Sequence, residues 1–203
     1  SAVRESDRAR PESLVVRSKL APPAVQEVVA EITQDAGAGT NGYARRRRTG
    51  VYRTLRMPVF DRFTSARQEA IPRRYLIPAR LTDIVQLLRR QGVTVGRISR
   101  PLRTSVQQFT VDSLSVDSLF EGHRSIQIEG RWRNEPLDSA ITAGWFGVST
   151  DQPLGTLAAY LLEPASEDGI VTWNLLDREL QPGQPYPILR GRQPLSAPTV
   201  LVP

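Results

Sequence analysis

Cysteine is absent from this 203-residue chain, and histidine and lysine occur once each, as His123 and Lys19. The absence of cysteine excludes thiol catalysis, thiolate metal sites and redox switching through thiols. A single histidine excludes a zinc site built on two histidines, and no thiolate can replace the missing ligand. The chain is nevertheless long enough to bury roughly 70% of its unfolded surface, so it needs no metal or disulfide to fold.

Long apolar runs and short catalytic motifs are also missing. The longest apolar runs, such as residues 157–162, are far shorter than the ~20 residues that a membrane-spanning helix needs. The chain contains no G-x-S-x-G nucleophile elbow, no phosphate-binding P-loop and no dinucleotide-binding glycine fingerprint. The sequence therefore predicts neither a membrane-spanning helix nor a cofactor.

Basic residues outnumber acidic ones, 27 to 21, and all but one of the basic residues are arginine. The first 103 residues hold 21 basic and 9 acidic residues, a net charge of +12, whereas the remainder hold 6 and 12, a net charge of −6. Codon bias explains the preference for arginine, but it does not explain the separation of charge. The two halves could pack on each other, or the basic half could face an acidic partner.

Arginines are densest between residues 45 and 56. Four consecutive arginines can bind phosphate, but strand alternation would divide them between two faces, and no aromatic platform of an RNA-recognition type accompanies them. We therefore expect a basic surface that faces protein or an anionic membrane, and we do not expect nucleic-acid binding. The candidate partner-binding residues are Arg45, Arg46, Arg47, Arg48, Arg53 and Arg56.

Apolar periodicity predicts three helices. After Pro22-Pro23, Val25, Val28, Val29 and Ile32 lie at i, i+3, i+4 and i+7, which predicts a helix that ends before the glycine-rich loop at 35–42. A second stripe predicts a helix over 81–90, with two arginines in the last turn and Gly92 as its cap. Residues 153–162 read as the third helix.

Alternating and β-branched segments predict a sheet. The predicted strands are 14–16, 45–60 around a Thr49-Gly50 turn, 75–77, 93–95, 106–116, 125–132 and 141–148, and residues 169–173 and 186–189 look extended. The expected fold class is α+β: β-rich, with a mostly antiparallel sheet covered by two or three helices and with extended termini.

Composition predicts three regions. Residues 1–50 form a basic N-terminal extension with one helix, residues 51–191 form the β-rich core domain, and residues 192–203 form a proline-rich tail without regular structure. Both extensions contain few large apolar side chains, so we expect their order to depend on a partner.

A few side chains outside the arginine cluster could still take part in chemistry. Glu163, Glu167, Asp168 and Asp177 are close in sequence and could supply a pair of carboxylates for hydrolysis, although acids beside proline and glycine are typical of solvated turns. We interpret His123 as a structural histidine, in a turn or partly buried, and a pH-sensitive contact is the alternative role for it. The three tryptophans, Trp132, Trp145 and Trp173, are core residues by default, and an exposed one would mark an interface.

The second half of the chain resembles a known family. The run DQPLGTLAAYLLEPASEDG at 151–169, followed by Thr172-Trp173-Asn174, is similar to the region after the catalytic domain in secreted bacterial zinc carboxypeptidases. Weaker similarity extends over about residues 50–191 and includes 74–79, 84–92, 120–123 and 186–188. The resemblance implies a β-rich accessory fold and a periplasmic or secreted location. The family's zinc ligands and catalytic glutamate have no counterparts here, so no catalytic residue transfers and we expect no enzyme activity.

Two roles are compatible with these observations. The first is a non-catalytic structural or interaction subunit, docked on protein subunits of a larger complex at the periplasmic face of a membrane and peripheral to that membrane. A photosynthetic reaction-centre assembly is one complex of this kind. The alternative is the accessory C-terminal domain of a secreted zinc carboxypeptidase whose catalytic domain is absent from this sequence. We favour the first role because both ends of the chain have the composition of partner-dependent segments.

Overall fold

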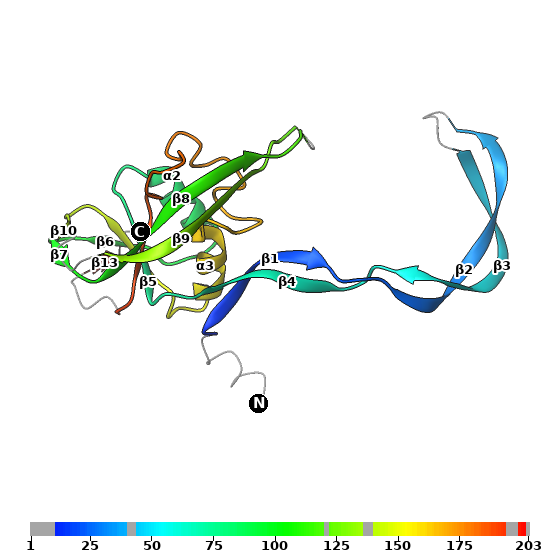
Figure 1. Cartoon of the computed structure of the whole chain (residues 1–203), viewed down its shortest axis with the longest axis horizontal. Helices are drawn as coiled ribbons and strands as arrows, with labels where there is room; N and C mark the ends of the chain where they lie inside the picture. Colours follow the sequence, from blue (N-terminus) through cyan, green and yellow to red (C-terminus); the bar gives the residue numbers. More distant parts are fainter. Residues whose placement is uncertain (1–10, 40–43, 120–121, 136–139, 194–198, 202–203) are drawn as a thin grey trace. The chain divides into compact units, whose positions relative to one another are not determined.

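The computed structural model describes residues 11–39, 44–119, 122–135, 140–193 and 199–201 (Figure 1). The chain divides into two compact units, of which unit 1 comprises Ser1–Ser18 and Ser65–Pro203 and unit 2 comprises Lys19–Thr64. Strands β1 (Ser13–Leu20) and β4 (Phe63–Ala70), which pair with each other, each cross a boundary between the units. The expected division after residue 50 is therefore wrong, because residue 50 lies inside a long strand of unit 2.

Unit 1 contains a seven-stranded sheet in which neighbouring strands run antiparallel. Its strand order is β13 (Thr199–Leu201), β6 (Gly96–Ile98), β11 (Phe146–Ser149), β5 (Arg74–Ile77), β12 (Leu189–Gly191), β8 (Val106–Val116) and β9 (Ile126–Glu135). A further antiparallel pair joins β7 (Leu102–Arg103) to β10 (Ala140–Ile141). The expectation of a β-rich, mostly antiparallel fold is confirmed.

The sheet is buried on both faces at its central strand β5. Tyr75 and Ile77 belong to the larger hydrophobic cluster, while Leu76, which points the opposite way, belongs to a smaller one. Burial on both faces explains why residues 75–77 are all apolar, since a strand covered on both sides has no solvent face that would require polar residues.

Two helices contribute to the larger cluster, and both were predicted. Helix α2 (Thr82–Arg90) and helix α3 (Gly155–Leu162) lie where the apolar periodicity places them. Two arginines in the last turn of α2 complement the helix dipole, and Gly92 follows with a left-handed φ of +84°. The buried residues of the two helices are Ile84, Val85 and Leu88 of α2, and Gly155, Ala158, Ala159 and Leu162 of α3.

Unit 2 contains a long antiparallel hairpin of β2 (Ala24–Ala38) and β3 (Ala44–Val59). The helix predicted from Val25, Val28, Val29 and Ile32 is therefore wrong. These four residues are all β-branched, and a partner strand with similar composition, including Val51, lies later in the sequence. Strand pairing accommodates such side chains better than a helix does, because β-branched residues lose χ1 freedom against the preceding turn of a helix.

Other boundaries also differ from the sequence expectations. The segment 93–95 precedes strand β6 instead of forming a strand, and residues 170–179 form successive turns. Thr49-Gly50 is an irregularity within β3 and not a turn, because the register shifts between Glu31 and Thr33 of the partner strand. In the proline-rich tail, residues 199–201 form strand β13, whereas 194–198 and 202–203 lie outside the described residues.

Candidate functional site

The hairpin of unit 2 has two faces of different composition. Residues directly opposite in an antiparallel pair share a face, and successive residues alternate between faces. What we call the apolar face consists of Ala24, Gln26, Val28 and Ala30 of β2 with Val59, Met57, Leu55 and Arg53 of β3, and six of these eight residues are apolar. The opposite, mixed face pairs Val25, Glu27, Val29 and Glu31 with Pro58, Arg56, Thr54 and Tyr52.

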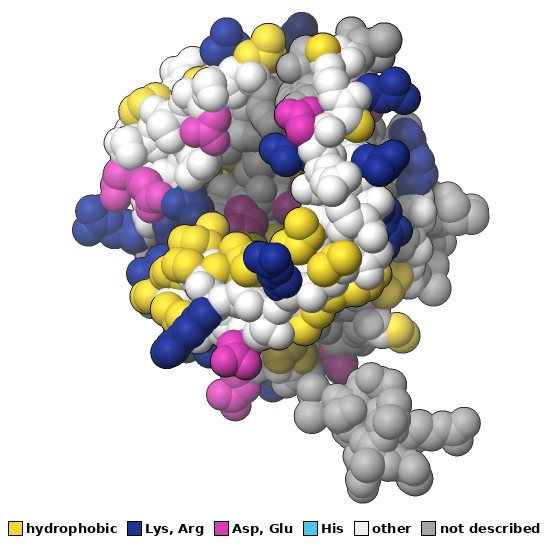
Figure 2. All heavy atoms as spheres, turned by 90° about the vertical axis from the view of Figure 1, so that its right-hand side faces the viewer, with side chains coloured by type: hydrophobic (Ala, Val, Ile, Leu, Met, Phe, Trp, Pro, Cys, Tyr) yellow, Lys and Arg dark blue, Asp and Glu magenta, His cyan; other side chains and the backbone are white. Residues whose placement is uncertain are grey.

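Both faces expose large apolar side chains. On the apolar face Leu55 and Met57 are 42% and 43% exposed, and on the mixed face Val29 is 68% exposed. Complete burial of a side chain of this size stabilises a fold by roughly 1.5–3 kcal/mol, so part of this free energy is unrealised. A two-stranded hairpin is by itself only marginally stable in water. On the face drawn in Figure 2, hydrophobic side chains gather in a band with basic side chains among and beside them.

All six candidate arginines lie on β3 and are exposed. The register confirms that alternation divides them, since Arg46 faces Asp35, Arg47 faces Gln34 and Arg48 faces Thr33 along the ladder. Arg48 forms an ion pair with Glu31 at 2.5 Å. No ion pair links the other five, which are Arg45, Arg46, Arg47, Arg53 and Arg56, to a carboxylate within the described part of the chain.

The irregularity in β3 is stabilised by Glu31. The backbone N–H of Gly50 donates to one Glu31 oxygen at 2.8 Å, and the other oxygen accepts from Arg48. Gly50 has a φ of +72°, a conformation that favours glycine. Thr49 donates from its hydroxyl to the carbonyl of Ile32. Glu31 therefore has a structural role, and one of the four consecutive arginines is occupied in fixing the bend of its own strand.

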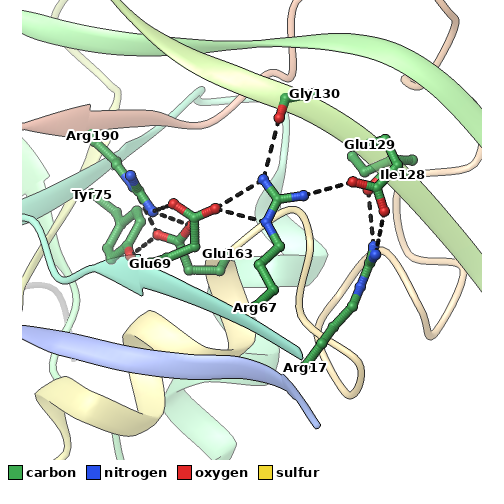
Figure 3. Close-up of polar contacts among 9 residues, drawn as sticks. All are labelled: Arg17, Arg67, Glu69, Tyr75, Ile128, Glu129, Gly130, Glu163 and Arg190. Atoms are coloured by element: carbon green, nitrogen blue, oxygen red, sulfur yellow. Dashed lines mark hydrogen bonds and ion pairs between the residues drawn. The ribbon is translucent and has the colours of Figure 1, made fainter. Parts of the chain in front are cut away.

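Arg190 and Glu163 form the centre of a network of buried hydrogen bonds and ion pairs in unit 1 (Figure 3). Arg190 of β12 donates through Nε to Glu163 at 2.8 Å, forms a second bond to the same carboxylate, and reaches Glu69 at 3.1 Å. The Tyr75 hydroxyl also donates to Glu163. The Arg190 guanidinium lies 4.0 Å from the centre of the Trp132 ring, within cation–π range.

Burial and charge act together on this network. Burial raises the pKa of Tyr75 well above its usual range, and the Glu163 carboxylate adds to this effect, while Arg190 opposes it. Glu163 in turn raises the pKa of Arg190, against the effect of burial. The group is thus a buried ion pair with a neutral tyrosine as a further donor to the carboxylate. The Glu163 side chain is only 1% exposed, and Arg190 and Tyr75 hold its carboxylate within the core.

The network continues towards β1 and β4 (Figure 3). Arg67 of β4 forms ion pairs with Glu69 at 2.9 Å and with Glu129 of β9 at 2.8 Å. Arg17 of β1 pairs with the same Glu129 and donates to the carbonyl of Ile128 at 3.0 Å. Both strands of the β1–β4 ribbon are therefore tied, within unit 1, to one carboxylate of the main sheet.

The four acids considered for hydrolysis each have a separate structural partner. Glu163 is buried, so its interpretation as a solvated turn residue is wrong, and it pairs with Arg190 as described above. Glu167 accepts from the backbone N–H of Ser18 at 2.9 Å, and Asp168 accepts from the indole N–H of Trp173. Asp177 accepts from Asn174 at 3.2 Å. Each of the four carboxylates is thus engaged by a different donor.

His123 and Trp173 lie together at the surface of unit 1. Their rings stack with centroids 4.8 Å apart. Trp173 is 55% exposed, unlike Trp132 and Trp145, which are partly buried against the hydrophobic clusters. Trp173 also lines an apolar pocket of about 320 Å³ together with Leu87, Leu161 and Leu175. Trp173 is therefore the tryptophan that meets the criterion of exposure set for a candidate interface.

The described residues contain neither a cluster of metal ligands nor a helix that could span a membrane. Among the described residues, no three histidine, aspartate or glutamate side chains lie close enough together to hold a metal ion. Neither helix in that part of the chain is long and apolar enough to span a membrane.

Comparison with known proteins identifies no relatives: no family model, no curated protein and no solved structure matches the chain.

Proposed function

We propose that this chain is a non-catalytic interaction subunit that uses the hairpin of unit 2 to dock on another protein. The observation that supports this proposal is the composition of the hairpin, which carries large exposed apolar side chains together with five arginines that form no ion pair with a carboxylate of the described residues. The partner we infer presents an apolar patch bordered by carboxylates. Such a patch would bury Leu55 and Met57 and would supply carboxylates to the arginines that form no ion pair with a described carboxylate.

A membrane-associated complex at the periplasmic face remains part of this proposal. The resemblance of residues 152–174 to the accessory region of secreted carboxypeptidases supports the location, and the basic hairpin is suited to a site beside anionic lipid head groups. The protein partner is the favoured occupant because the hairpin surface is as apolar as it is basic, and aliphatic side chains are matched by an apolar protein patch.

The test begins with the full chain purified from its native cells under mild cross-linking. Mass spectrometry of cross-linked peptides should connect residues of β2 or β3 to a second protein. With that protein in hand, Leu55→Asp combined with Met57→Asp should weaken binding at least about tenfold, because hot-spot side chains typically contribute 2 kcal/mol or more. Val116→Asp is the control, since Val116 is an exposed apolar residue on a strand of unit 1 and, at 54%, is somewhat more exposed than Leu55 or Met57.

Charge and alternative occupants are tested in the same system. Binding should weaken as salt rises, and Arg53→Glu should weaken it more than Arg178→Glu, an exposed arginine in unit 1. A doubled mass in sedimentation that is abolished by the Leu55 and Met57 substitutions would show that the hairpin binds a second copy of the chain. Binding to anionic vesicles without a protein partner would show a lipid-binding role. Either result contradicts the proposal.

A further inference from the structure

A second pocket in unit 1, of about 510 Å³, lies where β5, β12, β8 and β9 come together. Its polar lining consists of Arg73, Arg192, Gln107 and Asn134, and residues 70–72 form an apolar wall. This volume is typical of sites for small organic ligands and is much larger than an inorganic ion requires.

The two arginines face each other across neighbouring strands. Arg74 is paired with Gly191, so Arg73 and Arg192 occupy the next facing positions, and the backbone N–H of Arg73 donates to the carbonyl of Gly191 at 3.1 Å. Like charges directly opposite each other on adjacent strands are destabilising. Both side chains are exposed, and neither forms an ion pair with a described carboxylate. Glu69, the nearest acid along β4, is already engaged by Arg67 and Arg190.

The amide side chains complete a lining that is rich in donors. Gln107 Nε2 donates to Asn134 Oδ1 at 3.2 Å. This bond orients the amide of Asn134 and leaves its Nδ2 hydrogens free to donate to a ligand. A guanidinium presents a planar fork of donors that matches the two oxygens of a carboxylate or a phosphate. The lining therefore combines two positive charges and an amide donor beside an apolar wall.

We propose that this pocket binds a small organic dianion, whose carboxylate or phosphate oxygens are held between Arg73 and Arg192 and whose carbon skeleton lies against residues 70–72. A dianion neutralises both guanidiniums at once and removes the repulsion between them. The site belongs to unit 1 and uses none of the hairpin residues, so it stands independently of the docking role proposed above.

The test uses the full chain, titrated at constant ionic strength with succinate, inorganic phosphate and phenyl phosphate, with chloride as a reference. Calorimetry should show saturable binding of succinate or phenyl phosphate, and thermal unfolding should shift upwards as ligand concentration passes Kd. Succinate and phenyl phosphate distinguish a dicarboxylate from a phosphate monoester. Inorganic phosphate, which lacks a carbon skeleton, should bind more weakly than phenyl phosphate.

Substitutions then locate the binding. Arg73→Gln and Arg192→Gln should each weaken binding roughly ten- to a hundredfold, the range expected for losing a charge-assisted contact. Arg178→Gln removes the same charge elsewhere on unit 1 and should leave binding unchanged. Both pocket arginines are exposed, so these variants should fold, which circular dichroism would verify. Equal binding in all three variants would overturn the proposal. So would the absence of saturable binding of any probe up to about ten millimolar, a concentration that covers even the weakest specific sites.

Discussion

Replacing Arg190 by methionine removes the cation at the centre of the buried network of unit 1 while retaining a long, flexible apolar side chain. The guanidinium makes two bonds to Glu163 and one to Glu69, and it stacks on Trp132. The Arg190 and Glu163 side chains are only 4% and 1% exposed. Solvent cannot replace the lost contacts, so the substitution leaves a buried carboxylate without its counter-charge.

The expected cost follows from this burial. Removing one partner of a buried ion pair typically lowers the free energy of unfolding by about 3–5 kcal/mol. Unit 1 has a size at which each kcal/mol shifts the midpoint of thermal unfolding by roughly 2–4 °C, so a fall of roughly 6–20 °C is expected. All three tryptophans lie in unit 1, which makes tryptophan fluorescence in a urea titration a specific probe of this unit.

The pH dependence gives a second, independent reading of the same variant. Burial raises the pKa of the Glu163 carboxyl, and Arg190 opposes that rise. Without Arg190 the folded-state pKa rises further above the value of the unfolded chain. Stability from a raised pKa is fully present below the unfolded-state value and is lost as pH rises through the folded-state value. The penalty of Arg190→Met should therefore be smallest below about pH 4.5 and should grow towards neutral pH.

A matched control separates burial from pairing. Arg80 forms an ion pair with Glu179 at 2.6 Å, but the two side chains are 56% and 30% exposed. Arg80→Met should cost no more than about 1 kcal/mol and should show no comparable change with pH. If Arg190→Met costs no more than Arg80→Met, or if its penalty does not vary with pH, the interpretation of Arg190 and Glu163 as a buried pair is wrong.

Three further predictions concern the core of unit 1. Leu88→Ala should lower the free energy of unfolding by about 2–5 kcal/mol. This loss should exceed that of Leu87→Ala on the same helix, because Leu88 is fully buried and Leu87 only partly, and equal losses in urea titrations would contradict this prediction. Gly130→Ala should destabilise unit 1 because a Cβ there would overlap the backbone carbonyl of Thr110, and an unchanged thermal midpoint would exclude that close approach. The free energy of unfolding should fall as pH rises above 10, since burial raises the pKa of Tyr75 and unfolding releases its proton. Tyr75→Phe should reduce this loss of stability at alkaline pH, and an identical loss in the wild-type and Tyr75→Phe proteins would refute the role of Tyr75.

The sequence predicts best those elements whose residue pattern fits only one type of secondary structure. A stripe over 81–90 that ends in two arginines and a glycine fits a helix and no strand, and α2 forms there. The residues 24–38 have two solutions, because the spacing of Val25, Val28, Val29 and Ile32 is helical while their branching favours a strand. The choice between them depends on β3, whose pairing cannot be recognised from β2 alone.

The buried network shows a different limit of sequence reasoning. Its central pair joins Glu163 to Arg190, and Arg190 also reaches Glu69, 121 residues earlier. No local pattern connects such positions. One local signal was available, since Glu163 directly follows the apolar end of α3 and precedes a proline, and a carboxylate in that context is a candidate for burial. Its partner could not have been named, because 26 of the 27 basic residues are arginine.

The position of the outer ion pairs bears on how the ribbon of β1 and β4 is held within unit 1. A two-stranded ribbon has little core of its own, so its attachment must come from contacts with the main sheet. Arg17 and Arg67, one from each strand, meet at Glu129, and Val16 of β1 is fully buried and accepts a backbone bond from Glu167 at 2.8 Å. Charged and apolar contacts thus fix both strands where they belong to unit 1. Leu20 of β1 and Phe63 of β4 are exposed apolar residues that belong to unit 2, whereas the contacts that fix the ribbon come from residues of unit 1. The docking surface proposed for unit 2 therefore uses none of the side chains that attach the ribbon to the main sheet.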